Sequence, residues 1–165
     1  MYMYVVYSFD RNLEITGPMT VVTELPSKLS YIRHVEEDKL SPGSVLFATP
    51  FALTRTDNSR LDVIAGSLEG IDQQFSPFRM IHSFHQLNPS FVVVVDYSSC
   101  CLGQVDRPAG TTSAYMGVCS SDRTSCATVE GTENQARFNG PFSIIGDKRN
   151  TSVIFVSEIK GHRIR

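Results

Sequence analysis

Four consecutive valines at positions 92–95 are the feature that most constrains the fold of this chain. Phe91 and Asp96 flank the run, Pro89 lies just before it, and a cluster of serines and cysteines follows at 98–101. β-Branched side chains are stiff and pack well on a pleated surface, and a run without polar alternation leaves neither face suited to water. The run therefore predicts a central β-strand that other layers of the molecule cover on both faces.

The length and the composition predict one globular domain over residues 1–165. Hydrophobic residues make up 41% of the chain and charged residues 19%, close to globular averages, which argues against a disordered chain. A chain of this length buries roughly two-thirds of the surface that its unfolded form exposes. The net charge is only -2, so the composition does not support a nucleic-acid partner held by the field of the whole surface.

The N-terminus and the cysteines predict a cytoplasmic protein with reduced thiols. The apolar residues 1–7 have no basic region before them and reach Asp10 and Arg11 too early for a signal peptide. No segment approaches the ~18–20 apolar residues that a membrane-spanning helix needs. The chain has four cysteines, Cys100, Cys101, Cys119 and Cys126. Their density is below that of secreted disulfide scaffolds, from which we expect free thiols.

Alternating polar and apolar residues predict strands through most of the chain. The expected strands cover residues 2–9, 13–16, 19–25, 44–49, 51–56, 60–65, 142–145 and 152–159. The three runs within 44–65 predict a meander, and the last two flank turn formers at 146–150 and predict a terminal hairpin. Residues 98–135 are rich in Ser, Thr and Gly and predict shorter, more peripheral strands at 114–118 and 126–129.

Two short helices are expected beside these strands. Ser76 and Pro77 fit an N-cap followed by a proline at the first helical position, and Pro89 ends the segment. An apolar stripe supports this helix and consists of Met80, Ile81, Phe84 and Leu87. The second helix is expected over residues 27–40, although the acidic residues 36–38 oppose the helix dipole and leave a strand followed by an acidic turn as an alternative.

The expected fold class is therefore mostly β or α+β. We expect about eight to ten strands in antiparallel or mixed sheets, packed as a sandwich or a curled sheet with the two short helices.

Asp96 and two histidines are candidate catalytic or metal-binding residues. Asp96 ends the valine strand, where acids bind ligands or metals in α/β folds; the alternative is an acid that pairs with backbone N–H groups past a core strand. His82 and His85 would lie three apart on the expected helix and could ligate zinc with Asp96 or a cysteine. The alternative for both histidines is a half-buried ring with hydrogen-bonded nitrogens.

Cys119 is a candidate nucleophile. The order His34, Asp57 or Asp62, then Cys119 matches a small chymotrypsin-like cysteine protease, and Gly117 precedes the cysteine by two residues. No glycine follows the cysteine, which departs from that pattern. The alternative is a cysteine that packs as a small apolar side chain.

Basic residues near the C-terminus form a candidate polyanion contact. They are Lys148, Arg149, Lys160, Arg163 and Arg165. The alternative is ordinary solvated charge. The aromatic residues alternate within strand-like segments and are not interleaved with basic ones, so we expect them in the core rather than on a nucleic-acid platform.

Because no catalytic motif is intact, we expect a non-enzymatic binding or self-assembly protein, such as a matrix-like, capsid-like or adaptor component. It would act through strand edges and loops on a protein partner or on copies of itself. The alternative is a small cysteine- or metal-dependent hydrolase that uses Cys119 or Asp96 with a histidine. No motif calls for a cofactor.

Overall fold

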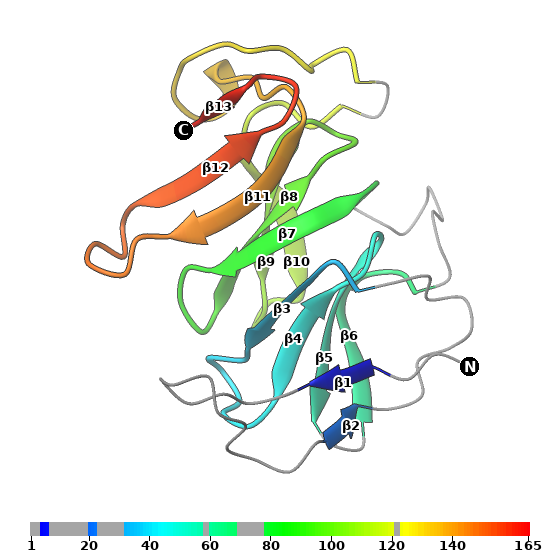
Figure 1. Ribbon diagram of the computed structural model, residues 1–165. Coiled ribbons are helices and arrows are strands. Elements are labelled where there is room, and N and C mark those ends of the chain that lie inside the picture. The colour runs from blue at the N-terminus through cyan, green and yellow to red at the C-terminus, as the bar shows by residue number, and fades with distance from the viewer. Residues whose placement is uncertain (1–3, 7–19, 23–31, 58–59, 69–77, 121–122) are drawn as a thin grey trace.

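A computed structural model describes residues 4–6, 20–22, 32–57, 60–68, 78–120 and 123–165 (Figure 1). Every strand pair in this part of the chain is antiparallel. The one helical element among the described residues is a 3₁₀ turn, η1 (Glu133–Gln135). The expectation of a mostly β sandwich or curled sheet is thus confirmed.

The strands of the described residues form four sheets. The smallest pairs β1 (Tyr4–Val6) with β2 (Thr20–Val22). The first four-stranded sheet contains β3 (His34–Glu37), β4 (Val45–Ala48), β5 (Ala52–Asp57) and β6 (Arg60–Gly66). The second contains β7 (Ile81–Gln86), β8 (Phe91–Asp96), β9 (Cys101–Asp106) and β10 (Thr111–Met116). The last contains β11 (Pro141–Gly146), β12 (Ile154–Glu158) and β13 (Arg163–Ile164).

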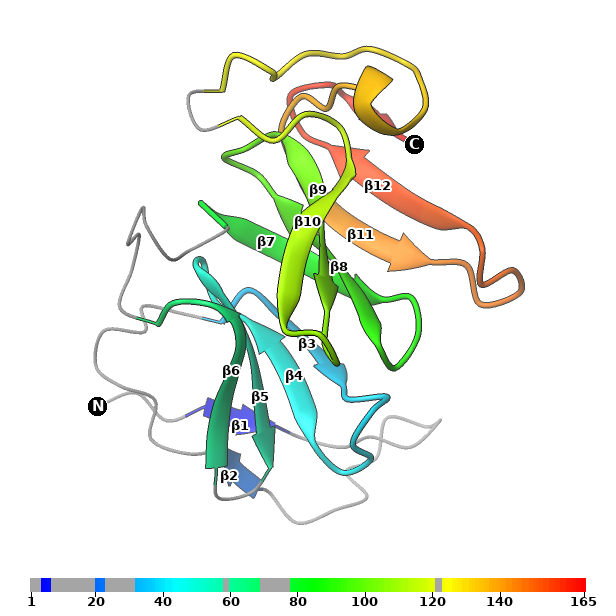
Figure 2. The same cartoon turned by 180° about the vertical axis from the view of Figure 1, so that it is seen from behind.

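The β7–β10 sheet is the central layer of the molecule. Figures 1 and 2 show it between the β3–β6 sheet and the β11–β13 sheet. Within it β8, the valine strand, pairs with β7 on one side and β9 on the other. All four valines have an exposed fraction of 0%, so the prediction of a central strand covered on both faces is confirmed.

Alternate valines supply two separate hydrophobic cores. Val92 and Val94 pack with Leu46 and Leu53 of the β3–β6 sheet. Val93 and Val95 pack on the opposite face with a second set of residues that includes Phe138, Ile144 and Val156. One strand therefore contributes to the packing of both outer layers.

The helix expected from Ser76 to Leu87 is wrong for the residues that the structure describes, because 81–86 form the strand β7. A β-bulge explains the misleading spacing: the register with β8 shifts between Ile81 and Ser83. The extra residue changes the phase of the alternation, so Ile81 and Phe84 face the same core although they are three residues apart. A period-2 strand with a bulge thus imitates part of a helical stripe. Ser76 and Pro77 lie outside the described residues.

The helix expected over 27–40 is also wrong where the structure describes it. Residues 34–37 form β3, and a turn follows at 38–43, which is the strand-and-acidic-turn alternative. The strand β9 was not predicted, and it is a central rather than a peripheral strand. Around 126–129 the structure has only an isolated bridge between Val129 and Arg137 in place of the expected strand.

The strand expected at 114–118 is found as β10, which begins and ends earlier, over 111–116. The other strand predictions are confirmed where they are described. The meander over 44–65 corresponds to β4, β5 and β6, and the terminal hairpin corresponds to β11 and β12. β1 lies within the expected strand 2–9 and β2 within 19–25, whereas the run at 13–16 lies outside the described residues. Over its described residues the structure contains no helix with the length and apolar character needed to cross a bilayer.

Candidate functional site

Two disulfides fasten the loops beyond the central sheet. Cys100 is bonded to Cys126, and Cys101 to Cys119, with Cα–Cα distances of 5.2 and 5.1 Å. The expectation of reduced thiols is therefore wrong. The low density of cysteines did not predict the disulfides, because the bonded cysteines are brought together by the tertiary structure. The turn between β8 and β9 lies against the segments that contain Cys119 and Cys126.

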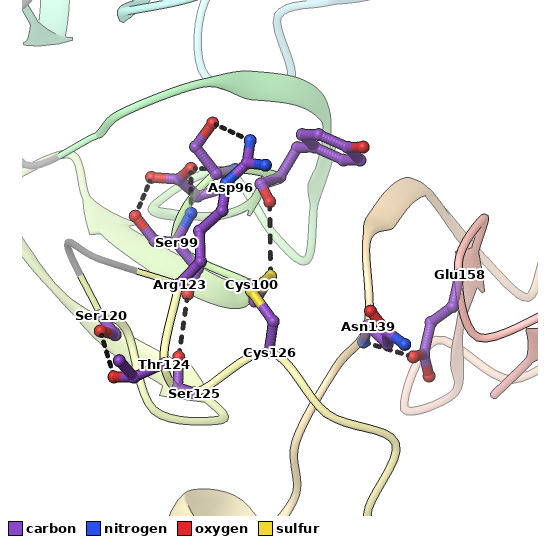
Figure 3. Close-up of a disulfide and its surroundings, with 12 residues drawn as sticks. Asp96, Ser99, Cys100, Ser120, Arg123, Thr124, Ser125, Cys126, Asn139 and Glu158 are labelled. Atoms are coloured by element: carbon purple, nitrogen blue, oxygen red, sulfur yellow. Dashed lines mark hydrogen bonds between the residues drawn. A yellow bond between two sulfur atoms is a disulfide. The ribbon is translucent and has the colours of Figure 1, made fainter.

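The Cys100–Cys126 disulfide forms one wall of a small cavity, which we call the Tyr97 pocket. Its volume is about 120 Å³. The lining residues are Tyr97, Cys100, Arg123, Cys126, Asn139, Gly140 and Lys160. They come from three places in the sequence: the turn after β8, the disulfide loop, and the segments that flank the β11–β12 hairpin. Figure 3 shows this disulfide with its surroundings.

Asp96 shapes the turn that carries Tyr97. Its carboxylate accepts hydrogen bonds from the backbone N–H groups of Arg79, Met80, Ser98 and Ser99, at 2.8–3.1 Å, and from the Ser99 hydroxyl at 3.0 Å. The side chain is buried, and five donors occupy its two oxygens. This geometry matches the alternative of a strand-end acid that pairs with backbone N–H groups, and it fixes the path of the chain into the pocket.

Two cations approach the Tyr97 ring. The Arg123 guanidinium carbon lies 5.5 Å from the ring centroid, and the Lys160 ammonium lies 5.9 Å from it. Arg123 also donates to the Ser98 hydroxyl at 3.3 Å. Among the described residues, neither cation lies within ion-pair distance of a carboxylate. The pocket is therefore a concentration of positive charge beside an aromatic ring.

Backbone hydrogen bonds hold the opposite wall of the pocket. The Ile159 N–H donates to the Gly140 carbonyl at 2.9 Å, and the Gly161 N–H donates to the Asn139 carbonyl at 3.0 Å. Gly140 has a φ of 66°, and a Cβ there would lie 3.1 Å from the Lys160 side chain. The Lys160 turn thus fits closely on residues 139–140.

A buried carboxylate lies behind this wall. Glu158 accepts a hydrogen bond from the Asn139 N–H at 2.6 Å and forms an ion pair with Arg165 at 2.7 Å. Its charge is therefore matched by Arg165 rather than by the cations of the pocket.

His82 extends the aromatic surface beside Tyr97. Its ring centroid lies 4.9 Å from that of Tyr97 and 4.4 Å from that of Phe142 on β11. Burial and the charge of Arg33 lower the pKa of His82, against an opposing effect of Asp96. The neutral ring therefore packs here as an aromatic surface.

The structure does not bring the two histidines of the expected metal site together. His85 lies three residues further along β7, about 10 Å at the rise of a strand. It contacts Glu36 instead, with its Nδ1 atom 3.4 Å from a carboxylate oxygen. In the described part of the chain, no group of three His, Cys, Asp or Glu side chains is arranged to hold a metal ion.

The residues of the expected cysteine-protease order also lie in different surroundings. Cys119 is in a disulfide, so it has no thiol to act as a nucleophile. Asp62 forms ion pairs with Arg55 at 2.8 Å and Arg60 at 2.7 Å. His34 contacts Phe84 and the Glu36 carboxylate. The cysteine version of the hydrolase hypothesis is therefore wrong in this disulfide-bonded form.

Glu36 is the centre of a polar cluster between β3 and β7. Its carboxylate interacts with His34 and His85, both at 3.4 Å, and accepts a hydrogen bond from the Gln86 amide at 3.0 Å. Burial raises the pKa of Glu36, but these interactions outweigh it and hold the pKa well below its ordinary value. Ser83, 3.3 Å from His34, is buried and also accepts the Ile144 N–H, so the cluster links three layers.

The basic residues predicted to contact a polyanion separate into three groups. Lys160 lies in the Tyr97 pocket. Arg163 pairs with Glu130 at 2.8 Å, and Arg165 pairs with Glu158 and Glu130. Lys148 and Arg149 lie on the turn between β11 and β12. Sequence reasoning missed Tyr97, Arg123 and Asn139, because these residues are distant in the sequence and tertiary contacts, among them the disulfide, bring them together.

No known protein-family model matches this chain, and no curated protein matches its sequence. Solved structures do match its fold. An auxiliary nutrient binding protein from Bacteroides thetaiotaomicron has a TM-score of 0.65 over 97% of this chain, with 18% identity. An auxiliary nutrient binding protein from Bacteroides ovatus has a TM-score of 0.55 over 74% of this chain, also with 18% identity.

A third match is a structural genomics protein of unknown function from Bacteroides thetaiotaomicron, with a TM-score of 0.59 and 18% identity over 73% of this chain. This chain spans 42% of the length of the first of these proteins, 34% of the second and 31% of the third. At this identity the likeness concerns the fold.

Proposed function

We propose that this chain is a non-enzymatic binding module that holds a small ligand in the Tyr97 pocket. The observation that carries the proposal is the pairing of Arg123 and Lys160 on one tyrosine ring without a carboxylate partner among the described residues. Rigid walls on both sides, a disulfide and a hydrogen-bonded turn, suit a preformed binding site. The auxiliary nutrient binding proteins of similar fold add support for a binding role.

Chemical-shift mapping on the ¹⁵N-labelled protein tests this proposal. The probes are neutral monosaccharides, sugar acids, amino acids and small organic acids. We expect at least one class to shift the amide signals of residues 97–101, 123–126, 139–140 and 160. Shifts confined to another surface, or no shift with any class, would overturn the proposal.

Self-association is a second candidate function, and one observation favours it. The outer face of the β11–β13 sheet exposes Ile145 by 61%, Phe155 by 42% and Ile164 by 74%. Ile145 and Phe155 are cross-strand partners, so their side chains form one apolar surface that a second copy would cover. Light scattering after size exclusion should show dimers that the substitution Phe155→Lys disrupts. A strict monomer at every concentration would reject this candidate.

The two disulfides support an oxidising compartment rather than the cytoplasm that reduced thiols would have implied. Protein isolated from its natural source with free thiols blocked at lysis should give new reactive thiols only after reduction. Thiols that are already blocked in the isolated protein would contradict this.

A further inference from the structure

We infer that the Tyr97 pocket binds an oxyanion group of its ligand, a carboxylate, sulfate or phosphate, between Arg123 and Lys160. This inference rests on the proposed binding function and names the chemical class that the pocket selects.

The pocket holds two positive charges. Arg123 and Lys160 point at one ring from different segments of the chain, 5.5 and 5.9 Å from its centroid. Two like charges at one small cavity repel each other, and an anion between them removes that repulsion. Arginine offers a fork of N–H donors that matches oxyanion geometry, and lysine adds a compact positive charge.

The nearest acids do not take the place of such an anion. Asp96 directs both oxygens to backbone N–H groups and to Ser99. Glu158 is engaged by the Asn139 N–H and by Arg165. Both carboxylates are buried and have partners other than Arg123 and Lys160, so the positive charge of the pocket remains available to a ligand.

The size of the pocket suits a small anionic group. Its volume of about 120 Å³ is roughly that of four waters, at ~30 Å³ each in the liquid. A carboxylate, sulfate or phosphate group with its connecting atom fits such a space, whereas an extended polymer does not. The rest of the ligand would lie outside, where His82 and Phe142 continue the aromatic surface from Tyr97.

The backbone of the pocket supports this assignment. Arg123 and Cys100 both adopt left-handed conformations, with φ of 64° and 53°. A side chain with a Cβ adopts this conformation at an energetic cost, and such residues concentrate at binding sites. The disulfide joins Cys126 to Cys100, and the Cys126 N–H donates to the Arg123 carbonyl at 3.1 Å, so Arg123 is held close to the turn that carries Tyr97.

The experiment compares two sugars that differ by one oxyanion group. Calorimetric or NMR titrations measure glucuronate against glucose, and sulfate, phosphate and acetate salts serve as isolated oxyanion probes. The charge-removing variants are Arg123→Gln and Lys160→Gln. The matched controls are Lys148→Gln and Arg149→Gln, which remove the same charge from the β11–β12 turn. Thermal unfolding confirms that each variant is folded.

We expect glucuronate to bind in the pocket and glucose to bind about tenfold more weakly or not at all, which corresponds to one charge-assisted contact. Arg123→Gln and Lys160→Gln should each weaken the binding of glucuronate by a similar factor, and the control variants should bind it with unchanged affinity. Among the isolated ions, the one that shifts the pocket amides at the lowest concentration identifies the preferred oxyanion.

The outcomes distinguish the two proposals. Glucose bound in the pocket as tightly as glucuronate, with no effect of either variant, would overturn the oxyanion assignment and leave the binding function standing. Pocket signals unmoved by every probe, charged or neutral, would overturn both. Equal weakening by the control variants would attribute the effect to net charge and would also overturn the assignment.

Discussion

The two sides of the central sheet are held to their neighbours by different kinds of interaction. Toward the β3–β6 sheet, the apolar core is accompanied by buried charge: Arg107 donates to both oxygens of Asp38 at 2.6 and 2.7 Å, and both side chains are almost completely buried. At the loops beside the β11–β13 sheet, two covalent bonds are present in addition to the buried ion pair of Glu158 and Arg165. The first region should therefore respond to pH and to loss of one charge, and the second to reductant.

The largest expected effect is that of breaking the Asp38–Arg107 pair. Arg107→Ala leaves the Asp38 carboxylate buried without its partner, which typically costs about 3–5 kcal/mol of unfolding free energy. Chemical denaturation measures this loss. The exposed pair of Arg163 and Glu130 is the matched control, and Arg163→Ala should cost less than about 1 kcal/mol. Similar losses of unfolding free energy in the two variants would mean that burial of an ion pair does not determine the cost of breaking it.

Removal of the disulfides should have the next largest effect. The bonds join residues 26 and 18 positions apart, for which loop-closure entropy predicts about 3 kcal/mol each. We expect the variants C100A/C126A and C101A/C119A to lose similar unfolding free energy in denaturation experiments. Only C100A/C126A should also lose binding in the Tyr97 pocket, because its disulfide lines that pocket. Equal binding by both variants would contradict this assignment.

The valine strand allows the two cores to be compared directly. Val93→Ala and Val94→Ala remove the same atoms from opposite faces of β8, both completely buried, and each should cost about 2 kcal/mol. Denaturation curves of the two variants should nearly superimpose. Thr112→Ala on the exposed part of β10 is the control and should have little effect. A negligible cost for either valine would show that its face of the sheet is not tightly packed.

The smallest expected effect concerns Glu36 and pH. Its pKa is lowered in the folded protein, so below the ordinary value of about 4.5 the unfolded chain binds more protons than the folded one at this site. Stability from this group is present above that pH and is lost as the pH falls. Glu36→Gln should flatten the decline in unfolding free energy between pH 6 and pH 3 by about 1 kcal/mol. Identical declines in the variant and the unmodified protein would contradict this.

Much of the fold could be predicted from the sequence because its signals are local. The valines at 92–95 have no polar alternation, and the meander and the terminal hairpin have strand-like runs with turn formers between them. The prediction for the residues of β7 was wrong because a bulge between Ile81 and Ser83 places Ile81 and Phe84 on one face of the strand. Helices show the same spacing of apolar residues. Local patterns identify a strand well only while its alternation is unbroken.

The candidate site was less accessible to sequence reasoning. Lys160 was identified as a basic candidate, but Tyr97 and Arg123 are far apart in the sequence. The Cys100–Cys126 bond, which joins residues 26 positions apart, and the hydrogen bond from Arg123 to Ser98 hold their two segments together. Asp96 was identified by its position at the end of the valine strand, and its five hydrogen bonds correspond to the alternative of an acid that pairs with backbone N–H groups. Residue order does not encode which donors will surround such a carboxylate.

Adjacent cysteines with different partners also have a consequence for oxidative folding. Cys100 and Cys101 are neighbours in the chain, so an exchange of partners would give an isomer that bonds Cys100 to Cys119 and Cys101 to Cys126. Four cysteines permit three fully oxidised isomers. In the structure Cys101 begins β9 and is bonded to Cys119, whereas Cys100 lies before that strand and is bonded to Cys126. Recombinant material therefore needs its connectivity verified before any ligand is assigned to it, by partial reduction and alkylation followed by sequencing of the peptide that contains both Cys100 and Cys101.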